Sequence, residues 1–308
     1  MKKYVILFVG LFAMIGQIEA HPTTENRRIQ ELVDSLTRRE MSNMGCHRGI
    51  VYVVETKTGK LIAHTSLEGS DDHFVPFTDT FYKEDDYLQG AVSYLALPSS
   101  GKVTPDTEID TRNGIYVKPN GEEVRDHNWR RGGYGPISLE SVLTHGSVVG
   151  YTMAIDSVYG NNMTDYFLKR RDFTAGVPET LMGILTFYNA IANDGCMVKI
   201  GNGTASVINE HMAVPEHIRM LQHGLEHCVS EGLFTKAGNE HVGVAACGRT
   251  LHITDTKYRL ELCGYFPLQH PRYTIRVVLE KENNPASAGG MCGPLFSRIV
   301  DGLLSYHE

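Results

Sequence analysis

The sequence lacks any long apolar run after its first twenty residues. The one strongly apolar run, from Tyr4 to Ile15, follows Lys2 and Lys3 and is shorter than the roughly 20 residues that a membrane-spanning helix needs. A basic start, a short apolar run and a small residue at Ala20 are typical of a cleavable signal peptide. We therefore expect export to the periplasm or outer cell envelope, removal of residues 1–20 and no stable membrane span in the mature chain.

An excess of basic residues is also absent. The chain has 29 Lys and Arg against 36 Asp and Glu, a formal net charge of −7, which makes nucleic acids and anionic membranes poor partners. It shows no repeats and no low-complexity tracts. With 308 residues and 42% hydrophobic content, it is long enough to bury one large core. We expect a linker or helix over residues 21–44 and one domain over residues 45–306.

Cysteine is sparse for an exported chain. The density is too low for a small domain held together by disulfides, and partly buried thiols with perhaps one bridge fit it better. Cys247 and Cys263 lie on either side of a predicted hairpin and form the first pair to test. The six cysteines are Cys46, Cys196, Cys228, Cys247, Cys263 and Cys292.

Two β-hairpins are predicted near the two ends of the chain. The first joins residues 49–55 to residues 61–66 through a turn at Lys57-Thr58-Gly59, and the second joins residues 258–266 to residues 273–280. Helical patterns cover residues 88–97, 138–145, 179–193, 215–230 and 294–304. Strands at both ends with helices between them favour an antiparallel sheet completed by distant segments and flanked by helices.

Several segments together resemble the transpeptidase domain of penicillin-binding proteins, in particular the high-molecular-weight kind of Bacteroides-like bacteria. They are GKVTPDTEIDTRNGIY (101–116), RDHNWRRGGYGPISLESVL (125–143), LTFYNAIANDGCMVK (185–199) and CGYFPLQHPRYTIRVVLE (263–280). The resemblance extends over most of the mature chain. It implies an α/β (α+β) fold of the β-lactamase and transpeptidase type, with an antiparallel sheet, flanking helices and a helical lobe. Compared with this family, we expect no N-terminal pedestal and no membrane anchor, and the stretch between Tyr151 and Glu179 is shorter than the usual insertion.

The resemblance also implies three catalytic motifs. A serine in S-x-x-K attacks a D-Ala-D-Ala stem peptide to form an acyl-enzyme, and the lysine one turn later accepts the serine proton. The second motif, S-x-N, relays protons and holds a substrate amide. The third, K-T-G, supplies a cation and a strand edge for the substrate.

None of the three motifs is intact at the positions that the family's spacing gives. The first falls on Tyr87 and Gly90. The second falls on Gly146-Ser147-Val148, and the third on Cys247-Gly248-Arg249-Thr250, where only Thr250 matches. Losing one member of such a catalytic unit costs up to about 10⁶ in rate. We therefore predict a non-catalytic binding or scaffolding protein of the cell wall, whose ligand is peptidoglycan stem peptide or a cell-wall protein, with no cofactor.

The alternative is an active D,D-transpeptidase, or a protein acylated by β-lactams, with a relocated nucleophile. Ser93 and Ser147 are hydroxyls near the predicted site. Cys247 is a possible thiol nucleophile with His252 or His145 as its base, although a buried strand residue is the better interpretation. Whether residues 67–87 fill the cleft, with Tyr82 and Tyr87 inside it, stays open.

His223 and His227 have the spacing of metal ligands on one face of a helix, with Cys228 beside them. No third ligand is evident near them, and Gly224 replaces the glutamate of metalloprotease motifs. A solvated helix face is the favoured interpretation, so no metal site is predicted. Arg125, Arg130 and Arg131 around Trp129 are interpreted as local structure at the rim of the cleft.

Overall fold

The computed structural model describes residues 24–70, 73–78, 89–160, 162–178 and 181–306. The helices are α1 (Thr24–Met44), α2 (Gln89–Ala96), α3 (Leu139–Thr144), α4 (Val148–Tyr159), α5 (Met163–Phe173), α6 (Leu181–Ala192), α7 (Pro215–Ser230) and α8 (Ala288–Ser305). The strands are β1 (Cys46–Glu55), β2 (Leu61–Ser70), β3 (His73–Pro76), β4 (Glu108–Asp110), β5 (Ile115–Val117), β6 (Glu123–Arg125), β7 (Pro136–Ser138), β8 (Met197–Val198), β9 (Val207–Asn209), β10 (Ala245–His252), β11 (Lys257–Phe266) and β12 (Tyr273–Glu282).

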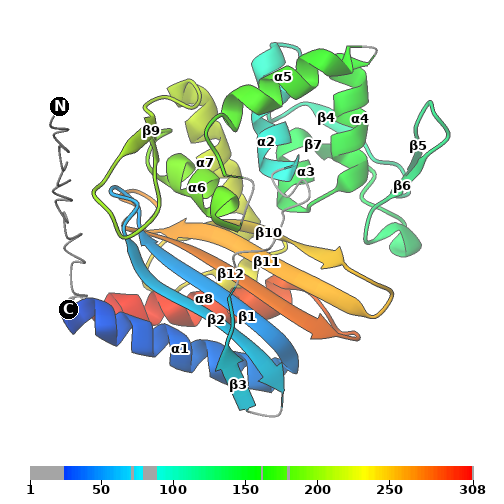
Figure 1. Ribbon diagram of the computed structural model, residues 1–308. Coiled ribbons are helices and arrows are strands. Elements are labelled where there is room, and N and C mark those ends of the chain that lie inside the picture. The colour runs from blue at the N-terminus through cyan, green and yellow to red at the C-terminus, as the bar shows by residue number, and fades with distance from the viewer. Residues whose placement is uncertain (1–23, 71–72, 79–88, 161, 179–180, 307–308) are drawn as a thin grey trace, which may run out of the picture.

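A six-stranded antiparallel sheet forms the centre of the molecule (Figure 1). Its strand order is β10-β11-β12-β1-β2-β3, so the N-terminal hairpin pairs with the C-terminal one through β1 and β12. Both predicted hairpins are confirmed, and so is the prediction that distant segments complete one sheet. β10 is an edge strand that pairs with β11 in register from Ala245 opposite Tyr265 to His252 opposite Tyr258.

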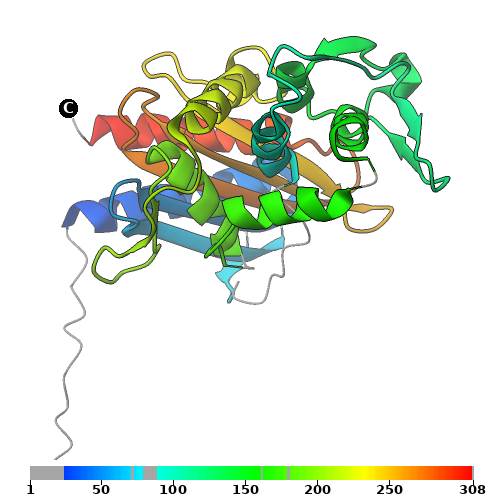
Figure 2. The same ribbon diagram turned by 90° about the horizontal axis from the view of Figure 1, so that it is seen from above.

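Helices cover both faces of this sheet. On one face, α1 packs against β1 and β2, while α8 packs against α1, β11 and β12 (Figures 1 and 2). Gly49 permits this close approach, because a Cβ at this position would lie 2.5 Å from the sulfur of Met41 in α1. On the other face, Asn189 of α6 accepts a hydrogen bond from the hydroxyl of Thr274 and donates one to the carbonyl of Thr56.

A helical lobe lies beside the second face. It contains α2, α3, α4 and α5 together with the short strands β4 to β7 (Figure 1). Helix α7 packs both on β10 and on α3, so it joins this lobe to the edge of the sheet. The expected antiparallel sheet with flanking helices and a helical lobe is therefore confirmed.

One helix boundary differs clearly from the sequence prediction. Helix α8 begins at Ala288, six residues before the predicted start at Pro294. Proline is favoured in the first helical turn, which is why the pattern points to Pro294. The N-cap is instead Ser287, whose hydroxyl accepts a hydrogen bond from the Gly290 amide, and Pro294 lies inside the helix.

None of the helices within the described ranges combines the length and apolar character that a membrane span requires.

Candidate functional site

The first motif position that can be located is Gly90, in the first turn of α2. A Cβ placed there would lie 3.7 Å from the ring of Tyr151 and 3.8 Å from its hydroxyl. The space beside the expected lysine position is thus filled by an aromatic side chain from α4. Tyr87 and Tyr82 lie outside the described residues, so the expected nucleophile position is untested. Of residues 67–87, which were considered as a cover of the cleft, residues 67–70 belong to β2 and residues 73–76 to β3, and residues 79–87 lie outside the described part of the chain.

The second motif position forms the junction between α3 and α4. Gly146 has φ +59°, a left-handed conformation that favours glycine. Ser147 is the N-cap of α4 and is fully buried; its hydroxyl accepts a hydrogen bond from the Gly150 amide and donates one of 2.7 Å to Asp126. The hydroxyl therefore holds a helix end in place, while the side chain of Val148 is exposed to solvent.

Asp126 completes this helix end from a distant loop. Its carboxylate is buried and accepts hydrogen bonds from the hydroxyl of Ser147 and, at 3.0 Å, from the amide of Val149. An anion at the N-terminus of a helix is favourable because it faces the positive end of the helix dipole. The Ser147 hydroxyl is consequently paired with an acid that serves the fold, inside a region closed to solvent.

The third motif position lies on the edge strand β10. The guanidinium of Arg249 donates a hydrogen bond of 3.3 Å to the carboxylate of Glu261. This carboxylate also lies 3.8 Å from the guanidinium of Arg276, and the side chains of Glu261 and Arg276 are fully buried. The one cation among these motif positions is therefore already paired within the sheet. Thr250 points to the other face, as strand alternation requires, and its hydroxyl accepts a hydrogen bond from the Ala288 amide of α8.

Cys247, at the expected position of the third-motif lysine, is buried and directed toward α7. Its thiol is hydrogen-bonded to that of Cys228, and this bond together with burial raises the pKa of Cys228. Cys247 and Cys263 are cross-strand neighbours, as the predicted hairpin implies, but none of the six cysteines forms a disulfide.

Neither histidine considered as a base for Cys247 is positioned for that role. The His145 ring stacks on Tyr134 with centroids 5.0 Å apart, and the His252 ring packs edge-on against Tyr258 at 4.7 Å. Among the contacts of the described residues, Cys247 has no polar contact with either ring. The arrangement gives no support to a cysteine nucleophile.

Ser93 is equally closed to solvent. It lies in α2 and is fully buried, and its hydroxyl shares a 2.7 Å hydrogen bond with that of Tyr166 in α5. Both hydroxyls considered as relocated nucleophiles are therefore buried and hydrogen-bonded within the fold.

Tyr151 links the three motif positions. It lies in the first turn of α4, just after Ser147, against Gly90, and near Cys247 and Cys228. Burial, followed by the proximity of Cys247, raises its pKa well above the usual value of 10.0. Its hydroxyl is buried without a hydrogen-bond partner in the described part of the chain. We call Gly90, Tyr151, Cys228 and Cys247 the sealed centre.

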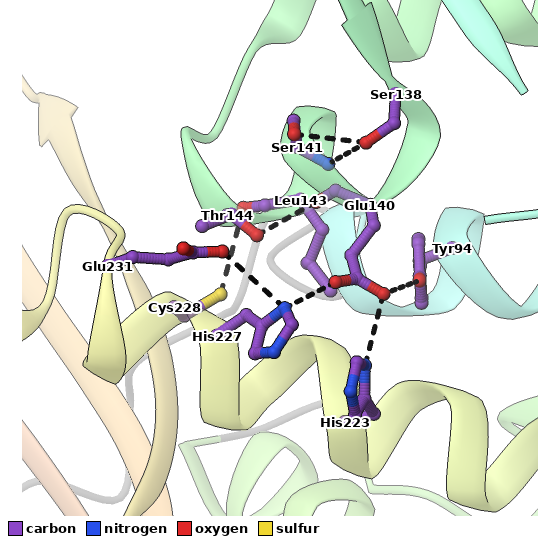
Figure 3. Close-up of polar contacts among 10 residues, drawn as sticks. All are labelled: Tyr94, Ser138, Glu140, Ser141, Leu143, Thr144, His223, His227, Cys228 and Glu231. Carbon is purple, nitrogen blue, oxygen red and sulfur yellow. Dashed lines mark hydrogen bonds and ion pairs between the residues drawn. The ribbon is translucent and has the colours of Figure 1, made fainter. Parts of the chain in front are cut away.

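A second group of polar side chains lies on the outer side of α7. His223 and His227 both direct a ring nitrogen at the carboxylate of Glu140 in α3, which the sequence did not connect with them (Figure 3). We call Glu140, His223 and His227 the histidine cluster. Unlike the sealed centre, the cluster is reached by solvent, since the side chain of His223 is 57% exposed.

The arginines around Trp129 make local contacts. Arg125 and Arg130 stack on the indole ring with their guanidinium carbons 4.5 and 5.0 Å from its centroid. Arg125 also pairs with Glu123. These contacts agree with the interpretation as local structure.

A hollow of about 750 Å³ is lined by residues of β1, β2, β3, β11 and β12. Charges alternate across four neighbouring strands there, with Arg259 next to Glu280, Glu280 next to Arg48, and Arg48 next to Glu68. None of the motif positions within the described residues lines this hollow.

Comparison with solved structures identifies the fold. The chain superimposes on a structure described as a peptidoglycan glycosyltransferase from Burkholderia ambifaria with a TM-score of 0.71 and 20% identity, over 91% of this chain and 96% of that one. It also superimposes on the apo TP (transpeptidase) domain of Burkholderia pseudomallei penicillin-binding protein 3, with a TM-score of 0.71 and 19% identity over 92% and 95% of the two chains. No family model and no curated protein sequence matches it. The chain thus has the fold of penicillin-binding protein transpeptidase domains, as the resemblance of its segments implies.

Two residues of these sites escaped the sequence reasoning. Tyr151 was named only as the start of the shortened stretch that ends at Glu179, and Glu140 only as part of a helical pattern. A signal for Tyr151 exists: it lies four residues after the N-cap Ser147, on the first turn of a helix that faces the motif positions. No comparable signal links Glu140 to histidines more than 80 residues away.

Proposed function

We propose that this chain is an exported, non-catalytic binding protein of the cell envelope that uses a transpeptidase fold. The observation that carries the proposal is the convergence of the motif positions on the buried side chain of Tyr151. An acyl-transfer site needs a cavity at this place, in which the reacting carbonyl lies within reach of the nucleophile and its base. Here an aromatic ring occupies the place.

The available hydroxyls support the same conclusion. Serine becomes a nucleophile only when a positioned base accepts its proton and the substrate reaches its oxygen. The hydroxyl of Ser93 is hydrogen-bonded to that of Tyr166, and the hydroxyl of Ser147 donates a hydrogen bond to the carboxylate of Asp126. Both serines are fully buried. The Ser147–Asp126 pair has the composition of a nucleophile and a base, but its geometry is that of a helix cap.

The edge strand β10 is the best place for a ligand. It pairs with β11 on one side and, among the described residues, with no strand on the other. An extended peptide can add to such an edge through backbone hydrogen bonds, without any catalytic side chain. Peptidoglycan stem peptide fits this mode, and an extended segment of a cell-wall protein is the alternative ligand.

Labelling with a fluorescent penicillin tests the absence of catalysis. We expect no covalent band on the purified chain under conditions that label an active penicillin-binding transpeptidase domain completely. A band that disappears in Ser147→Ala or Ser93→Ala would overturn the proposal and establish a relocated nucleophile.

Titration with soluble stem peptide tests the binding role. We expect saturable, noncovalent binding that is weakened by His252→Pro, because His252 is exposed on β10 and proline removes its amide from the free edge of the strand. Gly203→Pro, in an exposed loop away from β10, is the matched control. Absence of binding to stem peptide would leave a protein segment as the ligand of the edge strand.

A further inference from the structure

Three side chains from two helices form a group with the composition of a metal site. Glu140 comes from α3, and His223 and His227 come from successive turns of α7 (Figure 3). One ligand atom from each lies within 4.8 Å of the others. The Nδ1 atom of His223 is 3.2 Å from one carboxylate oxygen of Glu140, and the Nδ1 atom of His227 contacts the other oxygen.

The fold holds these side chains at this spacing. Residues four apart share a helix face, and the two imidazole rings have centroids 4.1 Å apart. Gly224 lets α7 approach α3 closely, since a Cβ there would lie 2.7 Å from the side chain of Leu143. The short helix that carries Glu140 is capped by Ser138, whose hydroxyl accepts a hydrogen bond from the Ser141 amide.

We propose that Glu140, His223 and His227 bind one divalent transition-metal ion, and that Zn²⁺ is the ion that this donor set fits. Two imidazoles and one carboxylate are a known zinc ligand set, with bonds of about 2.0–2.2 Å. Tetrahedral bonds of that length place ligand atoms roughly 3.3 Å apart, close to the 3.2 Å between His223 and Glu140. The metal fits between the three donors with small side-chain rotations.

The fourth coordination position is open to solvent. A carboxylate oxygen of Glu231 lies 3.6 Å from Nδ1 of His227, and its side chain is largely exposed. Either Glu231 or a water completes the coordination. His227 lies in the last turn of α7, where the helix dipole favours a cation.

The competing explanation is an ion pair between protonated histidines and Glu140. The two explanations predict that the interaction within the cluster changes in opposite directions as pH rises. A histidine binds metal only in its neutral form, so metal affinity rises with pH, whereas an ion pair requires the protonated form and weakens as pH rises. The rise in melting temperature on addition of zinc, measured at two pH values, therefore distinguishes the metal site from the ion pair.

The test uses the untagged chain without its first twenty residues, freed of metal by a chelator and titrated with Zn²⁺ alone in a calorimeter. We expect one ion per chain. Glu140→Gln and His223→Ala should each weaken zinc binding by about tenfold or more, while His217→Ala, on the same helix but outside the cluster, leaves it unchanged. Zinc should also raise the melting temperature more at pH 7.5 than at pH 5.5.

Two results would overturn the proposal. One is the absence of saturable zinc binding by the unaltered chain. The other is unchanged affinity in both cluster variants. Melting in chelator confirms that each variant is folded, and if Glu140→Gln is not, His223→Ala decides alone, because the His223 side chain is more than half exposed and its removal disturbs little packing. The zinc titration and the penicillin labelling can fail independently, because the first tests the histidine cluster and the second tests Ser93 and Ser147.

Discussion

The sealed centre and the histidine cluster are neighbours on one helix but have opposite surroundings. His227 and Cys228 are consecutive residues of α7. His227 faces Glu140 and solvent, while Cys228 is fully buried and hydrogen-bonded to Cys247. One step along the chain thus separates a polar, accessible group from a thiol enclosed in the core.

The difference shows how accessibility, more than residue type, decides what a group can do. The sealed centre and its neighbours contain thiols and hydroxyls of the kinds that act as nucleophiles, but they are enclosed in the core. The hydrogen bond with Cys247, together with burial, raises the pKa of Cys228, and burial raises that of Tyr151. The same hydrogen bond lowers the pKa of Cys247, which is buried as well. The cluster contains only weak nucleophiles, yet its donor atoms come from two helices and point at one another. The following predictions test each half of this contrast.

Removal of the Tyr151 side chain should have the largest effect. Tyr151→Ala empties the space between α2, α4 and β10, and we expect a loss of about 3–5 kcal/mol in the free energy of unfolding. The thiols of Cys228 and Cys247 should then react with alkylating reagents in the native state. Urea denaturation and mass spectrometry of alkylated protein measure the two effects.

Val148→Ala is the matched control for this substitution. Val148 lies on the same helix but is half exposed, so its truncation should change the free energy of unfolding by no more than about 0.5 kcal/mol. Equal losses in the two variants, with thiols that stay unreactive in Tyr151→Ala, would mean that Tyr151 does not seal the centre.

The sequence predicts the sheet better than it predicts the helical lobe. Both hairpins follow from β-rich runs around turn residues, and the observed strands contain the predicted ranges almost entirely. Helix α7 has the predicted bounds, because Pro215 marks its first turn. Helices α4 and α5 were not predicted, since α4 is apolar on most sides and α5 has little amphipathic pattern.

The sites were predictable only in part, for a related reason. Spacing counted from the segments that resemble the family assigns Gly90 and Cys247 to motif positions, and this assignment stays a prediction. That Tyr151 fills the space between them depends on how α4 packs against α2, which no local pattern specifies. In the same way, Glu140 meets His223 and His227 only through the packing of α3 on α7.

A pH above 10 should lower the free energy of unfolding. The expected loss lies between those for Tyr151→Ala and Tyr151→Phe at neutral pH. The pKa of Tyr151 is raised in the folded chain, so its contribution to stability is complete below the usual value of 10.0 and is lost as pH rises above it. Above pH 10, the unfolded chain loses this proton and the native chain keeps it. The unaltered chain should therefore lose about 1.4 kcal/mol more per pH unit than Tyr151→Phe does.

Urea denaturation at several pH values between 8 and 11 measures this difference. Parallel curves for the unaltered chain and Tyr151→Phe would contradict the raised pKa and would mean that water reaches the hydroxyl.

Removal of only the Tyr151 hydroxyl should have the smallest effect at neutral pH. This oxygen is buried without a hydrogen-bond partner among the described residues, so Tyr151→Phe should leave stability unchanged or increase it by up to about 1 kcal/mol. Tyr159→Phe is the matched control, because the hydroxyl of Tyr159, on the same helix, donates a 2.6 Å hydrogen bond to the buried carbonyl of Ala96. Its loss should cost about 1 kcal/mol, the usual net contribution of one hydrogen bond, because the hydroxyl of Ser99 still donates to the same carbonyl at 2.8 Å. If the two variants lose equal stability, the Tyr151 hydroxyl has a polar partner in solution, and the centre is then a hydrated site able to receive a polar ligand group.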